Sequence, residues 1–113
     1  GVGFFLNVHE GPQSISKFNK IKIQEGMILS NEPGYYKKGS FGIRIENLVF
    51  VKKIKNKILF ENLTLAPIDK ELINYNLLTK LEKDYLFKYH LNIYSKLSKY
   101  LTHKERKWLA TYI

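Results

Sequence analysis

The sequence predicts an α+β fold, with a β-rich part over residues 1–68 and a helical part over residues 69–113. Short apolar stretches separated by turn residues fill the first part, which favours hairpins and an antiparallel or mixed sheet. In the second part, apolar residues recur at spacings of three and four, which is typical of amphipathic helices. A hydrophobic fraction of 44% in 113 residues is enough for a globular core.

The β-rich part begins with weak signals that lead up to its clearest strand. Residues 21–23 alternate briefly between apolar and polar, and residues 27–30 predict an apolar strand that runs towards Pro33 and Gly34. Proline followed by glycine predicts a turn, and the tripeptide at 38–40 predicts a second turn.

The clearest strand covers residues 41–51, and its apolar positions are Phe41, Ile43, Ile45 and Val49. Since successive side chains of a strand point to opposite faces, we expect Ile43 and Ile45 to face the core. A polar turn over residues 52–57 follows. The next stretch, residues 58–68, predicts a further strand that ends near Pro67.

Two capping boxes mark the starts of two helices. Thr79 precedes Glu82 by three residues, and Thr102 precedes Glu105 by the same spacing. In such a box the hydroxyl and the carboxylate each accept a hydrogen bond from a backbone N–H at the helix start. The first helix is predicted to run to about Tyr100, with an apolar stripe of Leu81, Tyr85, Tyr89, Ile93, Leu97 and Tyr100. The second is short and carries Trp108, Leu109 and Tyr112.

Composition argues against several classes of partner. The net charge is +9, but seventeen of the nineteen cations are lysine, whereas bidentate recognition of phosphates and bases favours arginine. We therefore expect no nucleic-acid partner. No apolar run approaches the roughly 20 residues of a membrane helix, so no membrane partner is expected either. The absence of cysteine excludes disulfides and thiolate metal sites, and it fits a reducing, cytoplasmic location.

Two glutamates are the candidates for metal chemistry. Alternation places Ser30 and Glu32 on one face before Pro33, and Arg44 and Glu46 on one face of the clearest strand. Carboxylate oxygens suit hard divalent cations, and two acidic groups brought close would repel unless a cation or a proton lies between them. The alternative is that Arg44 and Glu46 form only a surface ion pair, which contributes little.

The histidines are less informative by pattern alone. His9 lies between Asn7-Val8 and Glu10-Gly11-Pro12, where either a chemical or a structural role is open. His90 and His103 lie in the helical part, and we expect them to be ordinary core or surface residues.

Four segments, taken in order, resemble the cytosolic-type Xaa-Pro aminopeptidases (aminopeptidase P). Residues 1–12 are similar to the family segment GVGxxLNVHEGP, residues 26–36 to GMxxxxEPGYY, residues 41–47 to FGIRIEN and residues 63–68 to LTLxPI. The pair Tyr89-His90 also matches a YH in the C-terminal helix of the family. The resemblance covers nearly the whole chain.

The resemblance implies the C-terminal part of a pita-bread fold, a curved antiparallel sheet with flanking helices that holds two metal ions. Residues 1–68 would be the C-terminal part of the catalytic domain, and residues 69–113 a helical C-terminal extension. The resemblance implies that Glu32 and Glu46 are metal ligands, with Glu46 bridging both ions and Glu32 also the general base. It implies that His9 is catalytic and contacts the substrate, and that Arg44 orients the carboxylate ligands. The ions would be two divalent cations, Mn²⁺ before Zn²⁺ or Co²⁺.

The resemblance also implies that three of the five metal ligands of the family, two Asp and one His, lie upstream of Gly1. We therefore expect a fragment of a longer polypeptide that is inactive alone and poorly stable, with the upstream half in the same chain or a separate one. The substrate would be a peptide with proline at its second position, and the helical extension would allow a homodimer. The alternative functions are a non-catalytic interaction module or degraded-gene product of the same fold, and a basic nucleic-acid binder.

Overall fold

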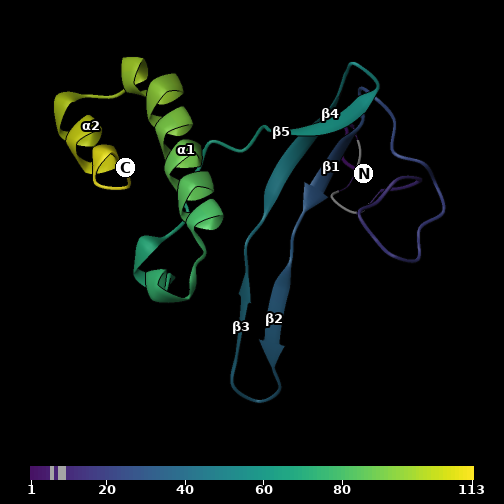
Figure 1. Ribbon diagram of the computed structural model, residues 1–113, viewed down its shortest axis with the longest axis horizontal. Helices are drawn as coiled ribbons and strands as arrows, with labels where there is room; N and C mark the ends of the chain where they lie inside the picture. The colour runs from purple at the N-terminus through teal and green to yellow at the C-terminus, as the bar shows by residue number, and fades with distance from the viewer. Residues whose placement is uncertain (6, 8–9) are drawn as a thin grey trace. The chain divides into compact units, whose positions relative to one another are not determined.

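The computed structural model describes residues 1–5, 7 and 10–113, which form two compact units, residues 1–64 and residues 65–113 (Figure 1). The first unit holds the strands and the second holds the helices, so the predicted order of β and then helical structure is confirmed. The assignment of residues 1–68 and 69–113 to a catalytic domain and an extension stays a prediction.

The first unit contains two antiparallel sheets. Three strands form the larger sheet in the order β1-β4-β5, and β2 pairs with β3 in a separate two-stranded ribbon (Figure 1). The strands are β1 (Ile28–Asn31), β2 (Gly34–Lys37), β3 (Phe41–Arg44), β4 (Asn47–Ile54) and β5 (Lys57–Asn62). The predicted turn at 38–40 joins β2 to β3, and the left-handed φ of Gly39, 70°, suits glycine there.

Two strand predictions, for residues 41–51 and 58–68, were wrong in their limits, and the brief alternation at 21–23 does not form a strand. Residues 41–51 are not one strand, because pairing stops after Arg44 and resumes at Asn47 with a strand of the other sheet. Residues 21–23 form no strand, since the backbone N–H of Ile21 donates to the side chain of Asn19 instead of a sheet partner. The last strand ends at Asn62 and does not continue to residue 68.

The turn between β4 and β5 is shorter than predicted. Strand pairing reaches Ile54 and Lys57, which leaves Lys55 and Asn56 as the loop where a polar turn over 52–57 was expected. Both loop residues have positive φ, 46° and 64°, as the two-residue hairpin turns that match strand twist require.

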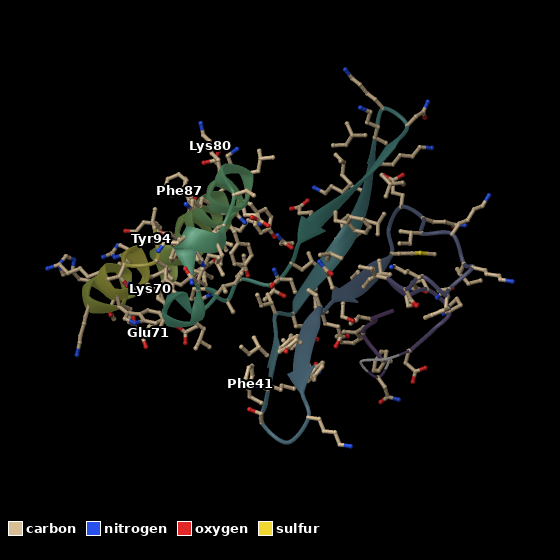
Figure 2. The ribbon with its side chains drawn as sticks, turned by 60° about the horizontal axis from the view of Figure 1, so that its bottom comes forward. Phe41, Lys70, Glu71, Lys80, Phe87 and Tyr94 are labelled. Atoms are coloured by element: carbon tan, nitrogen blue, oxygen red, sulfur yellow. The ribbon has the colours of Figure 1, made fainter. Side chains whose placement is uncertain are left out.

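The core of the first unit gathers on β1 and β4 and not on β3. Leu29, Val49 and Val51 are buried together, with Ile23 and Met27 packed against them. Ile43 and Ile45, which were predicted to face a core, are 45% and 47% exposed, and Phe41 lies at the exposed end of the ribbon (Figure 2). Among the described residues, β3 pairs with β2 in a separate ribbon, away from the cluster on the larger sheet, so none of these residues covers Ile43 and Ile45 fully.

Both predicted capping boxes are present. Helix α1 (Lys80–Leu97) begins after Thr79, whose backbone N–H donates to Glu82 Oε2 at 2.7 Å, and α2 (His103–Ala110) begins after Thr102 with the same arrangement around Glu105. Three short 3₁₀ helices accompany them: η1 (Lys70–Leu72), η2 (Tyr75–Leu77) and η3 (Ser98–Tyr100). Helix α1 therefore ends three residues before the predicted limit of Tyr100, and η3 covers those three residues.

The predicted apolar stripe of α1 is buried only in its middle. Tyr89 and Ile93 form a cluster with Leu109 of α2, and Leu65 and Ile68 of the preceding extended segment pack against it. Leu81, Tyr85 and Tyr100 are exposed, so the stripe marks the buried side of the helix but overstates the length that is covered.

His90 is a core residue of the second unit, and it joins two segments that are distant in sequence. Its side chain is 2% exposed, its Nε2 accepts the backbone N–H of Ile68 at 3.1 Å, and it makes a hydrogen bond with the backbone of Tyr112. The rings of Tyr89 and Tyr112 flank it at 5.5 and 5.6 Å between centroids. Burial lowers the pKa of His90 below its ordinary value of 6.5, although the bond to Tyr112 opposes this shift.

The lowered pKa of His90 predicts that acid destabilises the second unit. Below pH 6.5 the unfolded chain takes up a proton before the folded chain does, so stability is fully present above that pH and is lost as the pH falls towards the folded pKa. Urea unfolding of the chain between pH 8 and pH 5 should show this loss. The His90→Gln variant should flatten the pH dependence, whereas His103→Gln, at an exposed position, should leave it unchanged. Equal slopes in all three proteins would contradict the prediction.

Candidate active site

Glu32 and Glu46 lie opposite each other where the ribbon joins the larger sheet. The β1–β4 ladder pairs Asn31 with Asn47, and the β2–β3 ladder pairs Gly34 with Arg44. Glu32 follows Asn31 and Glu46 precedes Asn47, so the antiparallel register places Glu32 across from Glu46. The same register continues between the two ladders, because the backbone N–H of Ile45 donates to the carbonyl of Pro33 at 3.2 Å.

Arg44 supplies the positive charge between the two carboxylates. Its Nε is 3.5 Å from Glu46 Oε2 and 4.0 Å from Glu32 Oε2. A hydrogen bond to the side chain of Tyr36 raises the pKa of Arg44 most, and the charges of Glu46 and Glu32 raise it further. The Arg44 side chain is 52% exposed, so water screens these ion pairs and their contribution to stability is small. Arg44 therefore lies within ion-pair distance of both carboxylates while contributing little to the stability of the fold.

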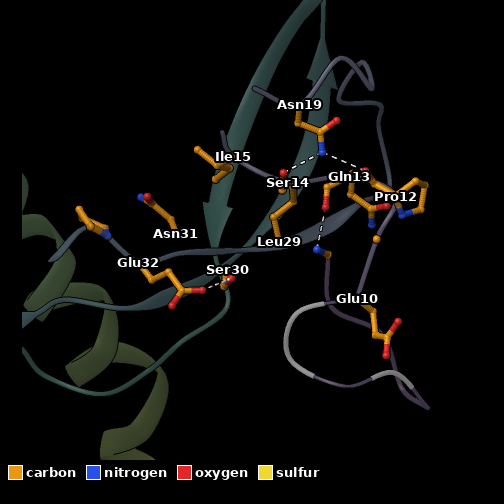
Figure 3. A pocket seen from close by; sticks show the side chains of 13 residues that line it. Glu10, Pro12, Gln13, Ser14, Ile15, Asn19, Leu29, Ser30, Asn31 and Glu32 are labelled. Carbon is orange, nitrogen blue, oxygen red and sulfur yellow. Dashed lines mark hydrogen bonds between the residues drawn. The ribbon is translucent and has the colours of Figure 1, made fainter. Parts of the chain in front are cut away.

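Ser30 also fixes the position of Glu32. The hydroxyl of Ser30 donates to Glu32 Oε1 at 2.7 Å, and the side chain of Glu32 is only 24% exposed (Figure 3). The predicted sharing of one face by Ser30 and Glu32 thus appears as a direct contact.

The paired glutamates fit the donor chemistry of a divalent cation but are incomplete as a site. Like charges directly opposite on neighbouring strands repel, which a cation between them would relieve. Carboxylate oxygens are also the ligands that such ions prefer. Among residues 1–5, 7 and 10–113, however, no group of three or more His, Cys, Asp or Glu side chains could hold a metal ion. The two carboxylates could therefore form one side of a metal site.

His9, the predicted catalytic histidine, lies outside the described residues. The described residues that follow it, from Glu10 to Ile15, line a pocket of about 540 Å³ beside Glu32 (Figure 3). The strand β1 and Pro33 form the opposite wall. This volume is within the range of small-molecule pockets. Sequence reasoning did not predict the pocket, because it depends on how the irregular segment 10–19 folds against β1.

Comparison with protein families identifies the chain. Residues 1–53 match metallopeptidase family M24, and residues 57–113 match the C-terminal region of peptidase M24. The chain belongs to the M24 metallopeptidase family. The resemblance to Xaa-Pro aminopeptidases, which rested on four short segments, is confirmed.

Among curated proteins, the "Probable Xaa-Pro aminopeptidase P" of Coprinopsis cinerea is 44% identical over 122 residues, covering 96% of this chain and 20% of the relative. The protein of the same name from Botryotinia fuckeliana is 48% identical over 107 residues, covering 85% of this chain and 16% of the relative. The chain thus spans about a fifth of the length of the curated relatives it matches.

A solved structure agrees with this M24 assignment. The X-prolyl aminopeptidase of Caenorhabditis elegans, described as a cytosolic enzyme with a di-nuclear active site, matches with a TM-score of 0.84 and 35% identity. The match covers 98% of this M24 chain and 20% of the C. elegans chain. It confirms the predicted pita-bread class of fold, with antiparallel sheets and a helical tail. Among the described residues, no helix is both long and apolar enough to cross a membrane.

Proposed function

We propose that this chain is the C-terminal fragment of a two-metal aminopeptidase that releases the N-terminal residue from Xaa-Pro peptides. The observation that carries the proposal is the placement of Glu32 opposite Glu46, with Arg44 beside both. A pair of opposed carboxylates is unfavourable in a purely structural sheet, whereas it is what a pair of cations requires.

The roles we assign are those that the resemblance to Xaa-Pro aminopeptidases implies, and membership of a metallopeptidase family and the positions of Glu32, Arg44 and Glu46 support them. Glu32 and Glu46 would hold the two ions, with Glu46 as the ligand common to both, and Glu32 would also accept a proton from the attacking water. Arg44 orients both carboxylates, and His9 contacts the substrate and stabilises the developing negative charge. The cofactors are two divalent ions, Mn²⁺ before Zn²⁺ or Co²⁺, which when bound acidify water and polarise the peptide carbonyl.

We also propose that the chain is inactive by itself. Two glutamates bind a divalent ion weakly and cannot fix a two-metal geometry, so the upstream half of the enzyme must supply the remaining ligands. The exposed apolar residues of the segment 41–45, Ile43 and Ile45 among them, support a requirement for that half. The intact protein would be cytoplasmic and could dimerise, with a peptide substrate and neither nucleic acid nor membrane as partner.

The test compares the 113-residue chain with the complete polypeptide, meaning the longest natural chain that contains it. An antibody against residues 70–113 establishes the size of that polypeptide in the source cell. With Mn²⁺, the complete polypeptide should cleave an Xaa-Pro peptide before proline. The 113-residue chain should do so only when the upstream half is added. Failure of the complete polypeptide with Mn²⁺, Zn²⁺ and Co²⁺ would overturn the proposal in favour of a non-catalytic interaction module. Cleavage by the short chain alone would contradict its inactivity.

A further inference from the structure

One wall of the pocket beside Glu32 is an irregular segment that the side chain of Asn19 helps to hold in place. Residues 10–15 line the pocket, and Asn19 lines it as well, while β1 and Glu32 lie on the other side (Figure 3). Irregular segments keep one shape only where side chains satisfy their backbone groups. The segment 10–15 contains no helix or strand, so its conformation depends on such bonds.

Asn19 uses the hydrogen-bonding capacity of both ends of its amide. Its side-chain nitrogen donates to the carbonyl of Pro12 at 2.9 Å and to Ser14 Oγ at 2.7 Å (Figure 3). Its Oδ1 accepts the backbone N–H of Ile21 at 2.8 Å. One half-buried side chain therefore ties the pocket wall at residues 12–14 to the chain that leads into β1.

We propose that Asn19 is a positioning residue for the peptide substrate. This inference rests on the proposed function, because it takes the pocket beside Glu32 as the place where the peptide lies. Asn19 touches neither Glu32 nor Glu46 through any bond described above, so it acts on the shape of the wall and not on the metal ligands. Without the hydrogen bonds that Asn19 donates, residues 12–14 should sample a wider range of conformations. Peptide binding should then be weaker, while the rate of the chemical step stays unchanged.

The variants test the donating nitrogen of the Asn19 side-chain amide separately from its accepting oxygen. Asn19→Asp keeps the oxygen that accepts from Ile21 but replaces the donating nitrogen with an oxygen, so the bond to the Pro12 carbonyl is lost and the Ser14 hydroxyl must donate instead of accept. Ser14→Ala removes one of those bonds without any change of charge. Asn74→Asp is the matched control, because Asn74 also accepts a backbone N–H, from Asn76, in a turn of the second unit.

The complete polypeptide is assayed with Mn²⁺ on an Xaa-Pro peptide, and Mn²⁺ affinity and thermal melting are measured on the same proteins. For Asn19→Asp we expect KM to rise about threefold to tenfold, the effect of one or two lost hydrogen bonds, with kcat within about twofold. Mn²⁺ affinity should stay unchanged. Ser14→Ala should raise KM in the same direction by less, and it provides the test if Asn19→Asp does not fold. Asn74→Asp should match the unsubstituted protein.

Failure of the proposed function and failure of the role of Asn19 alone would give different results. An unsubstituted polypeptide that cleaves no Xaa-Pro peptide overturns the proposed function, and the role of Asn19 with it. If the unsubstituted protein is active, an unchanged KM in both Asn19→Asp and Ser14→Ala overturns only the role of Asn19. A parallel loss of Mn²⁺ affinity or of kcat also overturns it, because the side chain would then act on the metal site or on the fold.

Discussion

The Glu46→Gln variant of the complete polypeptide should lose at least about a thousandfold in kcat for Xaa-Pro cleavage. The substitution keeps the size and shape of the side chain but removes the negative charge that faces Glu32 across the strand interruption. A neutral amide is a poor ligand for a hard divalent ion, so under the proposed role of Glu46 the variant would bind the ions poorly.

The same variant separates the catalytic interpretation from a purely structural one. Glu46 interacts with the exposed Arg44 at 3.5 Å, so its removal should leave the free energy of unfolding nearly unchanged. Loss of the repulsion from Glu32 offsets part of the lost attraction. Mn²⁺ affinity, measured by calorimetry, should fall together with kcat, while the melting temperature of the metal-free protein stays unchanged.

The control is Glu61→Gln, which removes a partly exposed carboxylate on β5 that also forms an ion pair, with Lys52. This variant should retain full activity and full Mn²⁺ affinity. If Glu46→Gln behaves like Glu61→Gln, then Glu46 forms only a surface ion pair and the metal interpretation fails.

The side-chain alternation of strands could place the candidate ligands on faces but could not bring them together. It predicted that Ser30 shares a face with Glu32, and the hydroxyl does contact that carboxylate. The opposition of Glu32 and Glu46 depends on register, which the hairpin turn at 38–40 sets through a connection of 13 residues. Alternation also shows which residues share a face of a strand, but it does not show which face other segments cover. For this reason Ile43 and Ile45 were wrongly predicted to lie in a core.

Local chemistry was predicted better than packing in the helices. A capping box is complete within four residues, so Thr79 and Thr102 marked both helix starts correctly. The apolar stripe of α1 depends on what other segments cover, and Leu109 reaches only its middle. The two hydrogen bonds of His90 link residues far apart in the sequence, which no periodicity reports.

The Ile93→Ala variant should lower the free energy of unfolding of the second unit by about 3 kcal/mol. Ile93 is fully buried, with 0% exposure, between Tyr89 and Leu109, so truncation leaves a cavity as well as losing apolar burial. Urea unfolding followed by the fluorescence of the single tryptophan, Trp108, measures this unit directly, because Trp108 lies in α2.

Leu81→Ala is the matched control, since Leu81 belongs to the same predicted stripe and the same helix but is 81% exposed. Its truncation should change the free energy of unfolding by less than about 0.5 kcal/mol, because little surface is uncovered and alanine favours the helix. A large loss at Leu81 would mean that this end of α1 is covered in solution and that the stripe predicted from the sequence is buried along its length. A small loss at Ile93 would mean that the cluster with Tyr89 and Leu109 does not hold this unit together.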